Sequence, residues 1–370
     1  MRVALFCHSL LSDWNHGNAH FLRGVVTELV ARGHDVRVFE PMDAWSVQNL
    51  VADHGEAALE AAARAFPEIA PVRYDAARLD LDAALDGCAL VLVHEWNEPD
   101  LVRRIGEHRR RRGGYRLFFH DTHHRSVTRP EEIAALDLSD YDGVLAFGEA
   151  VRRVYLARGW AARAWTWHEA ADARRFGPAA ADEQGALDGE VAWIGNWGDE
   201  ERTRELAEFL LEPVAALGLR ATVHGVRYPA EAIRTLAASG ARYGGWLPNF
   251  QVPAVLSRHL FTVHVPRRAY ARQLPGIPTI RPFEALACGT PLVCAPWDDA
   301  ERLFEAGTDY LLARDGEEMR RHMRALVADA DLRAELGRHG RQTVLRRHTC
   351  AHRVDELLAI YARLERGEEG

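Results

Sequence analysis

A glutamate stands within a largely apolar stretch at residues 279–293, TIRPFEALACGTPLV. Pro282 suits the first position of a helix and Gly289 the residue just past its end, so we expect a helix over Pro282–Cys288. The free amides of a helix start attract anions, phosphate above all. Glu284, in the first turn, could accept hydrogen bonds from hydroxyls beside that phosphate, such as a ribose diol. The alternative is that it only complements the helix dipole, for about 0.3–1 kcal/mol.

Four titratable side chains follow a strand-like run at residues 118–128, FFHDTHHRSVT. His120, Asp121, His123 and His124 are metal ligands by type. Their spacing matches no common metal site, and His120 would leave the end of a strand instead of a helix face. We therefore expect no metal, and the structural alternative for His120 is a ring satisfied by loop carbonyls.

Another strand-to-helix junction lies at residues 8–21, HSLLSDWNHGNAHF. Here His16, Gly17 and Asn18 at a helix start would let the backbone approach a ligand. A structural cap by Asn18 explains the same residues equally well. The run is not G-x-G-x-x-G, so the dinucleotide-binding fingerprint is missing from it.

Two polar residues, Glu95 and Asn97, follow a strand at residues 93–99, VHEWNEP, and we expect both side chains to face a bound ligand. The arginine-rich run at residues 107–114, EHRRRRGG, most simply closes a helix, because cations suit its carboxyl end and Gly113 stops it. The alternative for this run is contact with a membrane surface or an anionic acceptor.

Strand-like and helix-like segments alternate along the chain, in two runs. Residues 18–32 are typical of a helix, because apolar side chains recur at helical spacing and Gly33 ends the run. Such alternation implies parallel sheets covered by helices on both faces. We expect the chain after Asp299 to be mostly helical. The expected strands are Arg2–Cys7, Asp35–Phe39, Ala89–His94, Tyr115–Phe119, Gly143–Phe147, Val191–Ile194, Arg220–His224, Leu260–Val265 and Leu292–Ala295.

The predicted fold class is α/β, with two doubly wound, Rossmann-like domains that face a central cleft. A chain of 370 residues is long for one core, and residues 172–189 are rich in alanine, glycine and charge without periodicity. We expect a first domain over residues 1–172, a second over 173–345, and a C-terminal helix over 346–370 that packs back on the first. Ligands of such sheets bind beyond the carboxyl ends of the strands.

Composition narrows the class of protein. The net charge of −8 argues against general nucleic-acid binding. All 46 basic residues are arginine, which excludes lysine-dependent chemistry and assigns any side-chain contact to phosphate to guanidinium groups. No apolar run reaches the roughly 18–20 residues of a membrane span, the start lacks a cleavage-like site, and the five cysteines are scattered. We expect a cytoplasmic protein with reduced thiols.

The stretch RPFEALACGTPLV resembles the nucleotide-sugar motif of GT-B glycosyltransferases, especially the retaining GT4-type enzymes. It is most similar to the CgeB-like (spore maturation protein) branch, whose signature resembles R-x-FE-x-x-ACG-T-P. The resemblance spans nearly the whole chain and is strongest over residues 190–300. The other stretches that carry it, in order, are HGNAHFLRGVVTELVARGHDVRVFEP, WTWHEAADARRFGP, VAWIGNWGDEERTREL, ATVHGVRYP and GGWLPNFQVPAVLSRHLFTVHV.

The resemblance implies a donor site in the second domain. Glu284 would hold the ribose of the donor nucleotide, and Arg202 its phosphate, with Arg204 as the alternative. Arg281 would reach the same group as Glu284. The remaining donor-side positions are the backbone of Ile280, Pro282 and Phe283, the base-binding loop Trp246–Leu247, Asn196, Gly17 and Glu169.

The resemblance also implies catalytic and acceptor-side residues in the first domain. His120 matches the histidine that several GT4-type enzymes place at this strand end, where it could hydrogen-bond the donor sugar or an acceptor hydroxyl. Asp121 beside it is a further catalytic candidate, and Glu284 of the second domain is the third. The acceptor-side candidates are Glu95, Asn97 and His16.

The implied activity is transfer of a sugar from a nucleoside-diphosphate-sugar donor, with retention of configuration and without metal or cofactor. The acceptor is open: a glycan, a lipid, a protein or a small metabolite. One departure concerns the donor sugar, because Gly276 stands where many GT4-type enzymes have a first glutamate, eight positions before Glu284. The alternatives are a non-catalytic nucleotide- or carbohydrate-binding protein on the same scaffold, and a nucleotide-sugar epimerase.

Overall fold

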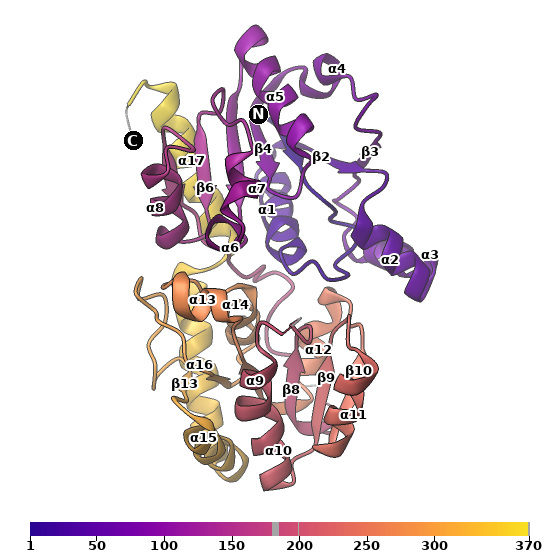
Figure 1. Cartoon of the computed structure of the whole chain (residues 1–370), viewed down its shortest axis with the longest axis vertical. Coiled ribbons are helices and arrows are strands. Elements are labelled where there is room, and N and C mark those ends of the chain that lie inside the picture. The colour runs from indigo at the N-terminus through magenta and orange to yellow at the C-terminus, as the bar shows by residue number, and fades with distance from the viewer. Residues whose placement is uncertain (180–184, 199, 369–370) are drawn as a thin grey trace. The chain divides into compact units, whose positions relative to one another are not determined.

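The computed structural model describes residues 1–179, 185–198 and 200–368. Its internal contacts divide the chain into two compact units, which Figure 1 shows. Unit 1 comprises residues 1–169 together with the C-terminal segment that begins at Cys350, and unit 2 comprises Ala170–Thr349. Each unit is built on one parallel sheet with helices packed against it, so the α/β, two-sheet architecture predicted from the sequence is confirmed.

Unit 1 contains a seven-stranded sheet with the order β3-β2-β1-β4-β5-β6-β7, and all of its recorded pairings are parallel. The strands are β1 (Arg2–Phe6), β2 (Asp35–Pro41), β3 (Val72–Tyr74), β4 (Cys88–His94), β5 (Arg116–Asp121), β6 (Gly143–Ala146) and β7 (Ala164–Thr166). The helices are α1 (Ala19–Ala31), α2 (Trp45–His54), α3 (Glu56–Ala65), α4 (Leu81–Leu85), α5 (Pro99–Arg112), α6 (Arg125–Thr128), α7 (Pro130–Ala134), α8 (Glu149–Ala157) and α17 (Cys350–Glu365).

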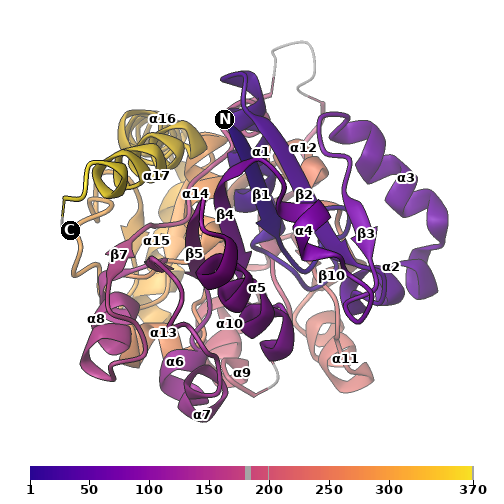
Figure 2. The same ribbon diagram turned by 90° about the horizontal axis from the view of Figure 1, so that it is seen from above.

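The central strands of unit 1 are covered on both faces, as parallel strands usually are (Figure 2). The side chains of β1, β4, β5 and β6 are almost all buried, which explains why these strands read as continuous apolar runs. The C-terminal helix α17 packs against α1, and the indole of Trp167 donates to the carbonyl of Arg353 over 2.8 Å. Arg32 and Asp355 join the same two helices through an ion pair of 2.6 Å.

Unit 2 contains a six-stranded sheet with the order β10-β9-β8-β11-β12-β13, also parallel throughout its recorded pairings. The strands are β8 (Gly189–Ile194), β9 (Ala221–His224), β10 (Ala241–Gly245), β11 (His259–His264), β12 (Leu292–Cys294) and β13 (Leu311–Leu312). The helices are α9 (Thr203–Leu206), α10 (Glu212–Leu217), α11 (Ala230–Ala238), α12 (Val252–Leu256), α13 (Arg268–Gln273), α14 (Ile280–Ala287), α15 (Gly316–Ala328) and α16 (Ala330–Arg347), with a π-helical turn at Ala207–Leu211 and a 3-10 turn at Asn249–Gln251.

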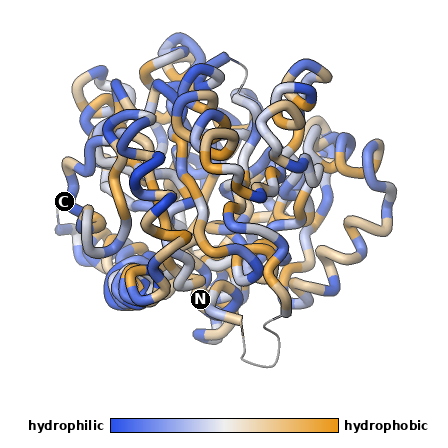
Figure 3. Tube along the Cα trace, turned by 90° about the horizontal axis from the view of Figure 1, so that it is seen from below, coloured by the Kyte–Doolittle hydropathy of each residue, from blue (hydrophilic) through white to orange (hydrophobic). Residues whose placement is uncertain are grey.

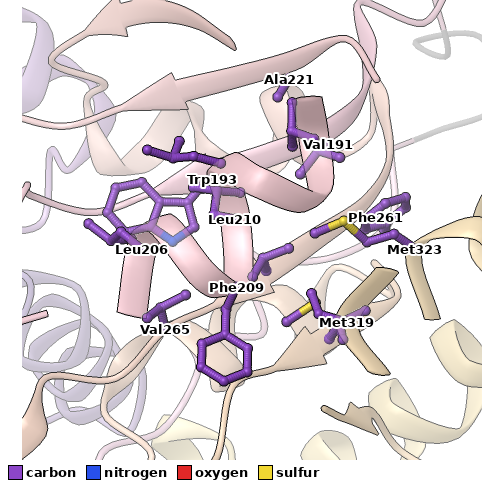
Figure 4. Packing of buried hydrophobic residues seen from close by; sticks show 14 of the residues in the cluster. Val191, Trp193, Leu206, Phe209, Leu210, Ala221, Phe261, Val265, Met319 and Met323 are labelled. Carbon is purple, nitrogen blue, oxygen red and sulfur yellow. The ribbon is translucent and has the colours of Figure 1, made fainter. Parts of the chain in front are cut away.

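The sheet of unit 2 separates two hydrophobic clusters. Successive residues of a strand point to opposite faces, so Trp193 enters one cluster and Ala192 the other. Figure 4 shows the first cluster, in which Trp193 and Phe209 pack with residues of α15. The second cluster holds the apolar side of α14, including Phe283.

Helix α14 begins at Ile280, two residues before the start predicted from Pro282. Thr279 precedes it with a φ of 61°, a left-handed conformation that sends the chain into the helix at a sharp angle. Proline is tolerated at the third position because the first amides of a helix have no intrahelical acceptor. The predicted end is confirmed, because Gly289 has a φ of 68° and its amide caps the carbonyl of Leu286 at 2.9 Å.

Hydropathy follows this layered architecture. Along the helices, hydrophobic and hydrophilic residues alternate in short stretches, as Figure 3 shows. In the part of the chain that the structure describes, no helix combines the length and the apolar character needed to cross a bilayer.

Candidate functional site

In unit 2, Glu284 is the centre of a buried polar group beside the carboxyl end of β11. It is the fifth residue of α14, not in its first turn as predicted, because the helix starts earlier. Its side chain is 1% exposed. One carboxylate oxygen accepts a hydrogen bond from the amide of Asn249 at 2.6 Å, and the other pairs with Arg281. The carboxylate is therefore held by side chains instead of by the free amides of the helix start.

Arg202 lies in the same region and is tied to the backbone. Its two terminal nitrogens donate to the carbonyls of Val265 (2.9 Å) and Asn196 (2.6 Å), and its guanidinium lies 5.1 Å from the ring centre of Trp193. Burial, and next the nearby Arg267, lower the pKa of Arg202 to about 9, so it stays charged at neutral pH. Arg202 thus joins the loop after β8 to the end of β11 and brings a half-buried positive charge there.

His264, the last residue of β11, was not predicted as a site residue. Burial lowers the pKa of its imidazole to about 3, with smaller contributions from Arg202 and Arg281. Its Nδ1 is buried and has no hydrogen-bond partner within residues 1–179, 185–198 and 200–368. Together with Arg281 and Glu284 it lines a cavity of about 20 Å³, which is room for roughly one water molecule. The signal that could have found it is its place at the carboxyl end of a predicted strand.

The other positions of unit 2 that were predicted to bind the donor differ in how they lie relative to Glu284. Asn196 accepts from the amide of Val226 at 3.2 Å, besides the bond to Arg202. Trp246 and Leu247 are half-buried in the loop after β10, with Leu247 packed against the second core cluster. The side chains of Ile280, Pro282 and Phe283 are buried, which leaves only their backbone for a ligand. Arg204 is exposed and lines a different cavity, so the structure does not bring it to Glu284.

In unit 1, four histidines form a buried row at the carboxyl end of the sheet. The ring centres of His8 and His16 are 5.6 Å apart, those of His16 and His94 6.0 Å, and those of His94 and His120 5.3 Å. His120 also lies edge-on to Trp167 at 4.8 Å. Only His16 and His120 were predicted as site residues. His8 and His94 join them because β1, β4 and β5 are neighbours in the sheet, which the sequence does not show.

Burial keeps these imidazoles neutral. It lowers the pKa of His120 to about 3 and that of His8 to about 4, and the pKa values of His16 and His94 fall well below their usual range for the same reason. Among the described residues, neither ring nitrogen of His120 has a hydrogen-bond partner, and His16 Nε2 and His94 Nδ1 also lack one. The loop carbonyls expected in the structural alternative for His120 are therefore not there, and the row is a polar surface suited to neutral hydroxyl groups.

Glu95 and Thr122 fix the loop that follows β5. Glu95 accepts from the amide and the hydroxyl of Thr122 at 2.8 and 3.0 Å, and it pairs with Arg125 at 2.8 Å. Asn18 donates to the Thr122 hydroxyl and does not cap α1, contrary to the structural alternative proposed for it. Glu95 is thus engaged within the protein, beside the histidine row through the 3.1 Å contact between His94 and Thr122.

Asn97 and Asp121 are also bound by the protein itself. The amide of Asn97 donates to the carbonyls of Phe6 and His94, and its oxygen accepts from Tyr74. Asp121 accepts from the Tyr155 hydroxyl at 2.7 Å and from the amide of His123 at 2.9 Å. Burial, and next Glu95, raise the pKa of Asp121 well above its usual range.

Two of the positions that were predicted to bind the donor, Gly17 and Glu169, lie in unit 1. Gly17 is exposed in the turn before α1, and Glu169 is buried at the end of the unit. The arginine run of α5 is largely ion-paired, with Arg110 bound to Asp140 and Arg112 to Asp82. No set of three or more histidine, cysteine, aspartate or glutamate side chains among the described residues could hold a metal ion.

Comparison with solved structures of known proteins identifies the fold. Solved structures share the fold over their whole length: a sucrose-phosphate synthase from Thermosynechococcus elongatus (16% identity, TM-score 0.68, all of both chains) and HepE from Anabaena in complex with UDP and glucose (13% identity, TM-score 0.69, 98% of this chain and 99% of that one). A third is the T4 phage BGT bound to its UDP-glucose substrate (12% identity, TM-score 0.58, 97% and 98%). The fold is therefore GT-B.

The family model described as glycosyl transferase-like matches residues 202–359, which include Arg202, Asn249, His264, Arg281 and Glu284. No curated protein matches the chain by sequence. The chain therefore has a GT-B fold and contains a glycosyl transferase-like segment over residues 202–359, which is less than half of its length.

Proposed function

We propose that the protein transfers a sugar from a nucleoside-diphosphate-sugar donor, held by unit 2, to an acceptor held by unit 1. The observation that carries this proposal is the group formed by Glu284, Asn249, Arg281, His264 and Arg202 beside the carboxyl end of β11. It joins a preoriented carboxylate, suited to a ribose diol, with two guanidinium charges, suited to a diphosphate.

The chemical problem in such a transfer is the charge that develops on the leaving diphosphate. The free amides at the start of α14 and the cations Arg281 and Arg202 supply fixed positive charge without a metal ion. One preorganised donor aimed at developing charge is worth about 2.7–4 kcal/mol of transition-state stabilisation. Undiminished turnover in the presence of a chelator would fit this proposal, and loss of turnover that Mg²⁺ restores would contradict it.

His120 is the proposed contact to the reacting sugar. Its ring is neutral at pH 7 and both nitrogens lack a partner in the part of the chain that the structure describes, so one can donate and the other accept a hydrogen bond to hydroxyls. Retention of the anomeric configuration is part of the proposal and follows the resemblance to GT4-type enzymes. NMR of the product formed from a donor of known configuration tests it.

Uridine diphosphate is the donor nucleotide to try first, because two of the structural neighbours named above were solved with UDP or UDP-glucose. A thermal-shift panel of uridine, guanosine, adenosine, cytidine and thymidine diphosphates and their sugars tests the proposal. A ligand at 100 times its dissociation constant should stabilise the fold by about 2.7 kcal/mol. Failure of every nucleotide to shift the transition would overturn the proposed donor site. Release of nucleoside diphosphate from the donor separates an enzyme from a pure binding protein.

A further inference from the structure

Unit 2 has a cavity that is larger than the one beside Glu284 and lies outside the proposed donor site, which is the group formed by Glu284, Asn249, Arg281, His264 and Arg202 (the donor group). It measures about 830 Å³ and lies where α9, α13 and the segments after β11 and β12 meet. Its apolar lining includes Phe209, Val265 and Ala295, all of the first core cluster. Figure 4 shows Phe209 and Val265 of this lining near one another. The volume falls within the range of about 300–1,000 Å³ that small-molecule sites occupy.

Four arginines line this cavity, and two of them are already neutralised. Arg268 forms a two-pronged ion pair with Glu205, at 2.7 and 3.0 Å. Arg314 lies 3.7 Å from a carboxylate oxygen of Glu318.

The other two, Arg204 and Arg272, come from α9 and α13 and form no ion pair among the described residues. The remaining acidic groups of the lining are Glu205, Glu208 and Asp298. Glu205 is held by Arg268, and Glu208 accepts from the amide of Gly316 at 3.3 Å. Two exposed guanidinium groups that form no ion pair among the described residues therefore line a cavity with both charged and apolar walls.

This cavity is distinct from the donor group. Glu284 packs on the face of the sheet that carries α12 and α14, whereas the cavity borders the cluster on the opposite face. Two neighbouring arginines differ in the same way. Arg267, just before α13, pairs with Glu201 and lowers the pKa of Arg202, whereas Arg268, the first residue of α13, lines the cavity.

We propose that this cavity binds a phosphate monoester of a small organic molecule. The two unpaired arginines match a dianionic phosphate, which guanidinium binds through paired hydrogen bonds. Phe209, Val265 and Ala295 match an apolar body attached to it. The sequence offered Arg204 as an alternative ligand of the donor diphosphate, and the structure assigns it to this cavity instead.

Isothermal titration calorimetry of the full chain with phenyl phosphate tests the proposal. Phenyl phosphate should bind more tightly than either inorganic phosphate or phenol, because each of these offers only half of the recognition. The double variant Arg204→Gln/Arg272→Gln should weaken phenyl phosphate binding by about tenfold or more. The matched control is Arg111→Gln, an exposed arginine of α5 in unit 1, which should leave it unchanged.

A UDP titration separates this cavity from the donor group. Arg272→Gln should retain the UDP affinity of the wild type, and UDP should not displace phenyl phosphate. Unchanged phenyl phosphate affinity in the double variant, or displacement by UDP, would overturn the proposed cavity while leaving the donor proposal intact. Absence of UDP binding together with retained phenyl phosphate binding would overturn only the donor proposal.

Discussion

The side-chain amide of Asn249 donates to Glu284 over 2.6 Å and joins two segments 35 residues apart. Both side chains are buried, and the second carboxylate oxygen of Glu284 pairs with Arg281. The carboxylate is consequently oriented before a ligand arrives. A preoriented acceptor loses little conformational entropy when a diol binds to it, which favours affinity for the correct ligand.

Removing the carboxylate charge should impair donor binding more than stability. Glu284→Gln retains the size of the side chain and one oxygen that can accept from Asn249, but it loses the ion pair with Arg281. Losing one charge-assisted hydrogen bond to the ribose costs about 1.5–3 kcal/mol, so UDP affinity should fall by roughly tenfold to a hundredfold. Glu284→Ala should lower it further and nearly abolish transfer. Calorimetry with UDP gives the affinities, and wild-type affinity in both variants would remove Glu284 from the donor site.

Asn249 should act through Glu284 as a positioning residue. Asn249→Asp places a second buried carboxylate against the first, and like charges at this distance disfavour the ionised form of both. We expect a raised KM for the donor and partial rescue at lower pH, where one of the two carboxylates is protonated. Gln251→Glu is the matched control, because it adds the same charge two residues away at an exposed position. An unchanged donor KM in Asn249→Asp would contradict this role.

The strands predicted from the sequence are the interior ones, and each is found. The four strands missed, β3, β7, β10 and β13, are the edge strands of the two sheets. Three of them have only two or three residues, and most side chains of all four are partly or wholly exposed. A short run of mixed polarity carries little periodic signal, whereas a strand buried on both faces stands out as a continuous apolar run.

Within the candidate site, too, only the residues marked by a local sequence pattern could be singled out from the sequence. Glu284 and Arg281 could be singled out because a charged pair in an apolar stretch is visible along the chain. Asn249 and His264 could not, since their role depends on contacts with residues far away in the sequence. Arg204 and Arg202 differ by two positions, and only the folded loop shows that one is tied to Asn196 and Val265 while the other faces a separate cavity.

Replacing His120 should slow turnover more than it raises the donor KM. His120→Ala removes a neutral ring whose nitrogens form no hydrogen bond with any residue that the structure describes, so none of the hydrogen bonds seen there is lost. General acid–base or hydrogen-bonding groups of this kind typically contribute about 10²–10⁴-fold to rate. His108→Ala is the matched control, a buried histidine of α5 bound to Tyr115 and Asp82 away from the strand ends. Steady-state kinetics decides: a raised KM with unchanged kcat would make His120 a binding residue only.

Acid should destabilise unit 1 through the histidine row. Burial lowers the pKa of His120 from an ordinary value of 6.5 to about 3. Between those values the unfolded chain binds a proton that the folded chain excludes, so the free energy of unfolding falls as the pH falls through this window. One such imidazole contributes about 1.4 kcal/mol per pH unit. Asp121 acts in the opposite direction, because its raised pKa lets the folded chain bind the proton first.

Comparing the wild type with His120→Leu isolates one member of the row. Asp121 and the other three histidines are present in both proteins, so their contributions largely cancel in the difference. Urea unfolding followed between about pH 7 and pH 5 should show a shallower loss of stability in the variant, by about 2 kcal/mol over the range. Parallel curves for the two proteins would show that His120 takes up its proton in the folded state, and the neutral imidazole that we assign to the reacting sugar would have to be abandoned.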